Sequence, residues 1–205
     1  MSGDYGAVRK LRKFLAPPAE RCDFCRVRVP DEHAHLVEAD TLRLFCSCPD
    51  CAGDMADGAP GFRRVEPRRE MVDDLAIADT DWAALQIPID VAFLFRPEEG
   101  ASPVALFPGP AGATRSELSG ETWAIMARKY PIFDELEPGA EALLVNRSGG
   151  RRDYYRVSTD HCYALAGLMR THWRGLAGGE RAWTEIDGYF VGLTEGPHLA
   201  RAGHA

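Results

Sequence analysis

Residues 22–51 read CDFCRVRVPDEHAHLVEADTLRLFCSCPDC, and this stretch decides how the first part of the chain folds. It contains two Cys-x-x-Cys motifs, one at Cys22 and Cys25 and one at Cys48 and Cys51, with 22 residues between them. Two such knuckles brought together close a tetrahedron of thiolates about 2.3 Å from a zinc ion. So short a segment has few apolar residues, whereas structural zinc supplies on the order of 10 kcal/mol of folding energy. We therefore predict a small zinc-ribbon-like module in which these four cysteines bind one structural zinc ion.

Three further candidate ligands lie between the two motifs, namely His33, His35 and Cys46. The apolar runs 35–37 and 42–46 flank residues 38–41, a pattern typical of a β-hairpin. That hairpin places Cys46 opposite His33 or His35, depending on its register. Sets of zinc ligands that include Cys46, His33 or His35 therefore remain alternatives to the four knuckle cysteines. Spare ligands beside a metal are typical of sites that sense redox state or transfer metal.

Iron is the alternative to zinc. The sequence from Cys48 to Cys51, followed by Ala-Gly, is close to the second knuckle of rubredoxins, and four thiolates bind iron as readily as zinc. Arg26 follows Cys25 where that comparison calls for glycine. The sequence therefore favours zinc over iron.

Length and composition limit the function classes. The chain has 205 residues, of which 45% are hydrophobic, so it can build one main domain with a small appended module. Its basic start lacks the apolar segment of a signal peptide, and no apolar run is long enough to span a membrane, so we expect a cytoplasmic protein. Five of the six cysteines fall within residues 22–51, which in a reducing compartment indicates metal binding rather than disulfides.

Charge is distributed unevenly. The formal net charge is −7, and residues 1–70 are balanced, so the acidic excess lies wholly after Glu70. That excess argues against nucleic acid as a partner of the larger domain.

The chain divides into four predicted segments: a helix over residues 1–20, the zinc-knuckle module with its linker over 21–60, an α+β domain over 61–195, and a frayed tail over 196–205. Glycine, proline and aspartate breaks predict the linker at residues 52–60. In the larger domain, apolar runs predict strands at 91–95, 104–107, 142–145 and 154–157, and helices at 121–130, 160–173 and 181–193. Two hairpins separated by one helix favour an antiparallel or mixed sheet with helices packed on one face.

Residues 107–117 form a candidate anion site in this domain. Small residues there leave backbone amides open, and Thr114, Arg115 and Ser116 could bind an anion or a peptide carboxylate. The other interpretation, which we favour, is a conformationally restricted connection without a ligand.

Cys162 stands at the start of a predicted helix, where the helix dipole can stabilise a catalytic thiolate. However, Cys162, Leu165 and Met169 share one helical face, which indicates a small residue of the core. The aromatic residues around 173–190 could form a partner surface, but core packing is the interpretation that we favour. The sequence contains no paired carboxylates, serine–histidine pair or HExxH motif, so we expect a protein that is not an enzyme.

Eight segments of the sequence carry a family resemblance: Cys22–Cys25, Glu32–Leu36, Leu44–Cys51, Trp82–Pro88, Phe107–Glu117, Glu141–Arg147, Asp160–Tyr163 and Trp173–Leu176. Together they resemble an uncharacterised actinobacterial family whose genes lie beside those of nickel-iron hydrogenases and their maturation factors. Arg115 and Gly109 depart from the acidic residue and the serine that are usual in that family at these positions.

The resemblance implies a zinc-binding accessory protein for assembly or maturation of a nickel-iron hydrogenase, acting through a protein partner such as a hydrogenase subunit or a maturation factor. One alternative is a rubredoxin-like iron protein that transfers electrons for a hydrogenase. The other is a zinc-ribbon regulator that binds nucleic acid, with basic residues at Arg26, Arg28, Arg43, Arg63, Arg64, Arg68 and Arg69.

Overall fold

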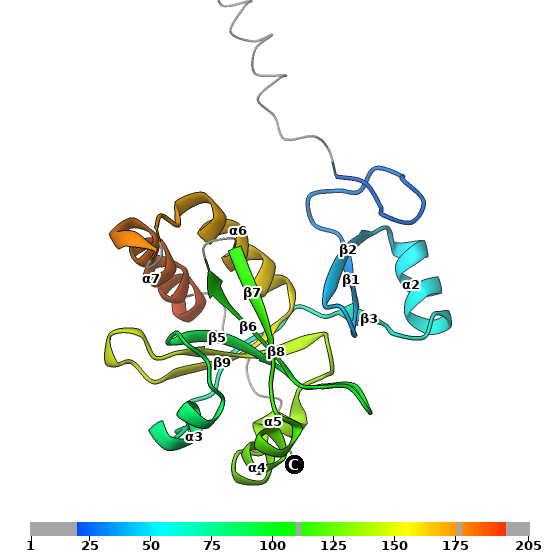
Figure 1. Ribbon diagram of the computed structural model, residues 1–205. Coiled ribbons are helices and arrows are strands. Elements are labelled where there is room, and N and C mark those ends of the chain that lie inside the picture. Colours follow the sequence, from blue (N-terminus) through cyan, green and yellow to red (C-terminus); the bar gives the residue numbers. More distant parts are fainter. Residues whose placement is uncertain (1–19, 110–111, 176–177, 196–205) are drawn as a thin grey trace, which may run out of the picture.

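A computed structural model describes residues 20–109, 112–175 and 178–195 of this chain (Figure 1). Apart from Glu20, the helix predicted over residues 1–20 and the tail predicted over 196–205 lie outside these ranges. The described residues have mixed α and β content and antiparallel sheets, as the sequence predicted. One sheet has three strands and the other has six.

The small sheet contains β1 (Ala34–Glu38), β2 (Arg43–Ser47) and β3 (Phe62–Val65) in the order β2-β1-β3. The predicted hairpin is confirmed, and its register pairs His35 with Cys46. This sheet carries α2 (Pro49–Gly58) on the side away from the large sheet (Figure 1). We call residues 21–65 the cysteine module.

The prediction of a linker over residues 52–60 is wrong, because most of these residues belong to α2. Cys48 is the N-cap of that helix, and Pro49 occupies its first turn. The Ala52 amide donates to the Cys48 carbonyl at 2.9 Å, and Ala52 is fully buried. Proline is well suited to a first helical turn. Glycine has a low helix propensity, but burial of one side of α2 outweighs that unfavourable contribution.

The large sheet contains six strands in the order β4-β9-β8-β5-β6-β7, and all of its pairs are antiparallel. Their bounds are β4 Arg69–Met71, β5 Val91–Phe95, β6 Val104–Gly109, β7 Gly112–Glu117, β8 Glu141–Asn146 and β9 Asp153–Ser158. The four predicted strands correspond to β5, β6, β8 and β9, and both predicted hairpins are confirmed.

Helices cover both faces of this sheet, so the prediction of helices on one face is wrong (Figure 1). One face packs against α6 (Asp160–His172) and α7 (Gly179–Glu195), and the other against α3 (Asp79–Ala84), α4 (Gly120–Lys129) and α5 (Ile132–Glu135). Every residue of β5 and β8 is buried. A central strand without apolar–polar alternation is the expected sequence of a sheet covered on both sides.

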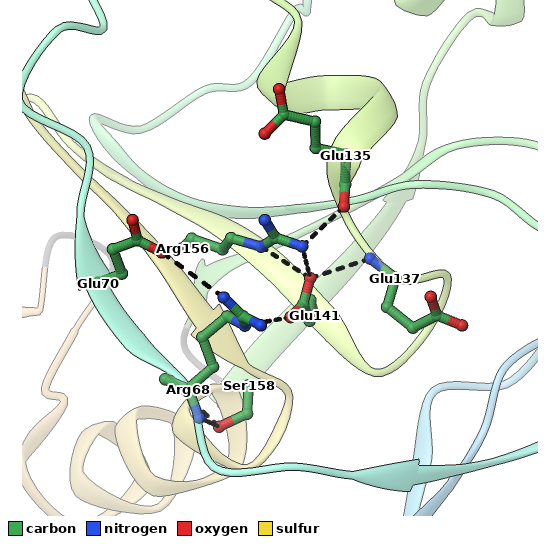
Figure 2. A network of polar contacts seen from close by, with 7 residues as sticks. All are labelled: Arg68, Glu70, Glu135, Glu137, Glu141, Arg156 and Ser158. Carbon is green, nitrogen blue, oxygen red and sulfur yellow. Dashed lines mark hydrogen bonds and ion pairs between the residues drawn. The ribbon is translucent and has the colours of Figure 1, made fainter. Parts of the chain in front are cut away.

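A buried carboxylate joins three strands at the edge of this sheet (Figure 2). Glu141 on β8 accepts from the Arg156 guanidinium on β9, at 2.8 Å to Nε, and it also pairs with Arg68 beside β4. The Glu137 amide donates to the same carboxylate at 3.0 Å. Glu141 is only 7% exposed, so these partners replace the water that the charge would otherwise require.

The cysteine module docks on the large domain through the turn between β1 and β2. Leu42 in this turn enters the core beneath α6 and α7, and its carbonyl accepts from the Tyr163 hydroxyl. Arg115 on β7 donates to the Asp40 and Thr41 carbonyls at 3.1 and 3.2 Å. The module and the domain therefore share buried contacts.

Among the described residues, no helix has the length and apolar content that crossing a membrane requires.

Candidate metal centre

The four predicted ligands meet in one cluster. The sulfur atoms of Cys22, Cys25, Cys48 and Cys51 all lie within 4.8 Å of one another, and the Cys25 and Cys48 sulfurs are 3.7 Å apart. A tetrahedron with zinc–sulfur bonds of about 2.3 Å has edges of about 3.8 Å. The observed separation therefore fits four thiolates around a single ion. We call these residues the four-cysteine cluster.

Backbone hydrogen bonds form the first knuckle. The Cys22 amide donates to the Val27 carbonyl at 2.8 Å, and the Arg26 amide donates to the Cys22 carbonyl at 2.9 Å. This turn requires a left-handed backbone at Arg26, whose φ is +66°. Arginine thus takes a conformation that glycine adopts more easily, so the missing glycine does not prevent the knuckle from forming.

The second knuckle is the start of α2. Cys48 caps this helix and Cys51 lies in its first turn. The positive end of the helix dipole favours thiolates at both positions.

Three aromatic rings, which no motif in the sequence indicated, hold the first knuckle against the small sheet. Phe24, between two of the ligands, stacks on Phe45 with ring centroids 5.6 Å apart and packs edge-on against Phe62 at 5.9 Å. Asp23 adds two hydrogen bonds to Cys46 on β2, one from its amide and one to its carboxylate, each 2.8 Å long. An aromatic residue inside a knuckle is the only signal for this packing in the sequence.

The surroundings of the four sulfurs differ. Cys22 and Cys48 are buried, Cys51 is half-buried and Cys25 is exposed. Burial raises the pKa of the Cys22 thiol, but hydrogen bonds from the Cys25, Cys48 and Phe24 amides outweigh it and lower this pKa to about 6.

The neighbouring sulfurs have the opposite effect on Cys51. Hydrogen bonding to the Cys48 and Cys25 sulfurs raises the pKa of the Cys51 thiol. The hydrogen bond from the Val27 amide lowers the pKa of the Cys25 thiol, but hydrogen bonding to the Cys22 and Cys48 sulfurs, together with burial, outweighs it, so this pKa is also raised. Without a cation, four thiolates so close together repel one another, and a bound dication removes that repulsion.

The alternate ligands form a separate group. Ligand atoms of His33, His35 and Cys46 lie within 4.8 Å of one another, and this group does not share a member with the four-cysteine cluster. We call these three residues the His-Cys trio.

Cys162 is a core residue, as its helical face predicted. It is 4% exposed and packs with Leu165 and Met169 in the core. Burial and the nearby Asp160 charge raise the pKa of its thiol well above the usual value, which suits an inert side chain.

The candidate anion site at Thr114, Arg115 and Ser116 is not formed. These residues belong to β7, where they pair with β6 in register. They therefore form an edge strand rather than the open loop on which an anion site was predicted. Most of the residues predicted as a restricted connection likewise belong to β6 and β7. Arg115 binds the backbone of the cysteine module instead.

The aromatic residues near the end of the chain belong mainly to the core. Trp173 and Phe190 are buried, and Trp183 and Tyr189 pack against them. Core packing, rather than an exposed partner surface, is confirmed for this set.

Comparison with known proteins identifies a family. The sequence has no significant match among the curated proteins or the solved structures. A family model described as a family of unknown function, DUF5947, matches residues 21–197, a span that contains both knuckles, the His-Cys trio and the whole large domain. Because this match covers most of the sequence, the chain belongs to the DUF5947 family.

Proposed function

We propose that this protein is a zinc-binding accessory protein for the assembly or maturation of a nickel-iron hydrogenase, and that it acts in the cytoplasm by binding a protein partner. The observation that carries this proposal is the four-cysteine cluster, whose sulfur separations suit a closed structural site. The sequence resemblance described above supplies the link to hydrogenases.

A binding role rather than catalysis agrees with the chemistry of the cluster. Four protein thiolates complete the coordination of zinc and leave no position for a substrate or an activated water. The cluster also holds Phe24 and the first knuckle in place, so the ion orders a surface of the protein. We therefore expect loss of the ion to abolish partner binding through loss of that surface.

A gene deletion tests the role directly. We expect the deletion strain to lose hydrogenase activity, and the parent gene to restore it. The Cys51→Ser variant should fail to restore activity because it lacks one thiolate, whereas Cys162→Ala, which changes a cysteine outside the cluster, should succeed. Unchanged hydrogenase activity and cofactor content in the deletion strain would rule the proposal out.

A rubredoxin-like electron carrier is the second candidate, and the exposure of Cys25 favours it. An exposed thiolate ligand gives electrons a short path from the ion to a partner. Purified protein with iron in the cluster would absorb in the visible range, whereas zinc-loaded protein is colourless there. A colourless protein with zinc as its only metal would eliminate this candidate.

A further inference from the structure

The His-Cys trio has the composition and spacing of a second metal site. His35 on β1 and Cys46 on β2 are cross-strand partners, so their side chains lie on the same face of the small sheet. His33 comes immediately before β1, and its ring packs edge-on against that of His35 with centroids 4.6 Å apart. The ligand atoms of all three residues lie within 4.8 Å of one another, the same limit that the four-cysteine cluster satisfies.

An unsatisfied nitrogen points independently to a ligand at this site. The His33 side chain is only 3% exposed, and its Nε2 atom is buried without a hydrogen-bond partner among the described residues. Its other ring nitrogen, Nδ1, lies 2.9 Å from the Pro30 carbonyl. A carbonyl only accepts, so Nδ1 carries a proton, and in the neutral ring Nε2 then presents a lone pair. Histidine ligands of metal ions are commonly held this way, with one nitrogen on a carbonyl and the other on the ion.

The position of the trio also favours a cation. Val37 and Leu44 share its face of the sheet and contact Ala140 of the large domain, so this face is turned toward the domain. The Glu20 carboxylate lies 3.6 Å from His33 Nδ1, so an acidic group stands beside the trio.

We propose that His33, His35 and Cys46 form a second metal site, separate from the four-cysteine cluster, which binds a divalent first-row transition-metal ion such as zinc. Two imidazoles and a thiolate suit such ions, and three protein ligands leave a fourth coordination position open. An external ligand can enter there, which a closed four-thiolate site prevents. This second site goes beyond the proposed accessory role and does not depend on the link to hydrogenases.

The two sites share one support. Asp23 lies between two ligands of the four-cysteine cluster and binds the Cys46 backbone through both its amide and its carboxylate. An ion in the four-cysteine cluster orders the first knuckle and hence the strand that carries Cys46. The second site should therefore bind metal only when the first is filled.

Cobalt titration of the reduced, metal-free, full-length protein tests this proposal. We expect the parent to bind two Co²⁺ ions per chain and the Cys46→Ser and His33→Gln variants to bind one. The remaining ion should keep the absorption spectrum of four-thiolate coordination. The controls Cys162→Ala and His172→Gln remove a cysteine and a histidine outside both sites, and they should still bind two ions.

A competition experiment separates the two sites by affinity. A chelator of moderate strength should remove one ion from the doubly loaded parent well before the other, because three ligands bind more weakly than four thiolates. The Cys46→Ser variant should lack the first phase of release.

A parent protein that saturates at one ion per chain would overturn the proposal. Loss of the four-thiolate spectrum in Cys46→Ser would also overturn it, since Cys46 would then belong to the first site. Circular dichroism of each variant checks the fold. If Cys46→Ser does not fold, His33→Gln and His35→Gln decide the question through the same stoichiometry.

Discussion

Cysteine chemistry in this protein depends on what surrounds each sulfur. Cys22 receives several backbone hydrogen bonds that stabilise its thiolate, whereas Cys162 has an apolar environment that keeps its thiol protonated. Cysteine is thus a candidate metal ligand at one position and a small core residue at another.

Replacing Cys162 with alanine removes only one buried sulfur atom. We expect Cys162→Ala to lower the free energy of unfolding by about 1 kcal/mol, measured by chemical denaturation, and to leave metal content unchanged. In the folded parent, Cys162 should resist alkylation until the protein unfolds. Rapid alkylation of Cys162 in the folded, metal-loaded protein would contradict its assignment to the core.

Gly139 is required where the cysteine module meets the large domain. Its φ is +69°, and a Cβ atom there would lie 2.7 Å from the Ala39 Cα in the β1–β2 turn. Gly149 has a similar φ of +62° but no atom within 4 Å of the same position, so it is a matched control for the backbone conformation alone.

We expect Gly139→Ala to lower the free energy of unfolding by about 1–3 kcal/mol more than Gly149→Ala, because the alanine must displace the Ala39 backbone. Thermal or denaturant unfolding of both variants provides the comparison. Equal losses would mean that the module and the domain do not pack closely at this point.

At the scale of secondary-structure elements, strands with long apolar runs could be predicted from the sequence. Strands that form because they pair with a neighbouring strand could not. β5 and β8 are apolar almost throughout, so their sequence alone identifies them. β7 has little apolar character, and pairing with β6 makes it a strand. β4 has three residues, and among the described strands it pairs with β9 alone, which lies far along the chain.

The four-cysteine cluster was predictable because each knuckle is a local motif. The spacing of Cys22 to Cys25 and of Cys48 to Cys51 fixes which sulfurs can approach one ion. The members of the His-Cys trio depended on the register of the β1–β2 hairpin. The sequence did not decide whether His33 or His35 lies opposite Cys46. The structure pairs His35 with Cys46, and His33 reaches the same place from just outside the strand. Without that register, the sequence could not distinguish a single site with both cysteine and histidine ligands from two separate groups of ligands.

Charged contacts around Glu141 hold β4, β8 and β9 together, and their loss should be measurable. Glu141→Gln removes the charge that Arg68 and Arg156 share, so we expect it to lower the free energy of unfolding by roughly 2–3 kcal/mol. Glu135 is the matched control, since its backbone carbonyl binds Arg156 while its exposed carboxylate points away from the network (Figure 2).

Urea denaturation of Glu141→Gln and Glu135→Gln tests this network. Glu135→Gln should change the free energy of unfolding by less than about 0.5 kcal/mol, as is usual for an exposed position. Similar effects of the two substitutions would show that the Glu141 charge contributes little to the fold.

At the scale of the whole molecule, the cysteine module and the large domain differ in what stabilises them. The module has few buried apolar residues around its ligands, mainly Val29 with Phe24 beside it. The large domain has two extensive apolar cores, one on each face of its sheet. Metal binding should therefore control the order of the module while the domain remains folded.

Hydrogen–deuterium exchange before and after chelation tests this division. Removing metal should speed amide exchange throughout residues 22–58 and partly around Tyr163, whose hydroxyl binds Leu42. Central strands β5 and β8 should keep their protection. Similar protection of residues 22–58 with and without metal would contradict a metal-dependent module.

The metal content of the purified full-length protein and of its Cys51→Ser variant tests the central claim most directly. If the four-cysteine cluster holds a structural zinc ion, the parent retains at least one zinc per chain after exposure to a moderate chelator, and Cys51→Ser retains none. A Cys51→Ser protein that keeps as much zinc as the parent under the same treatment would show that these four cysteines are not the ligands.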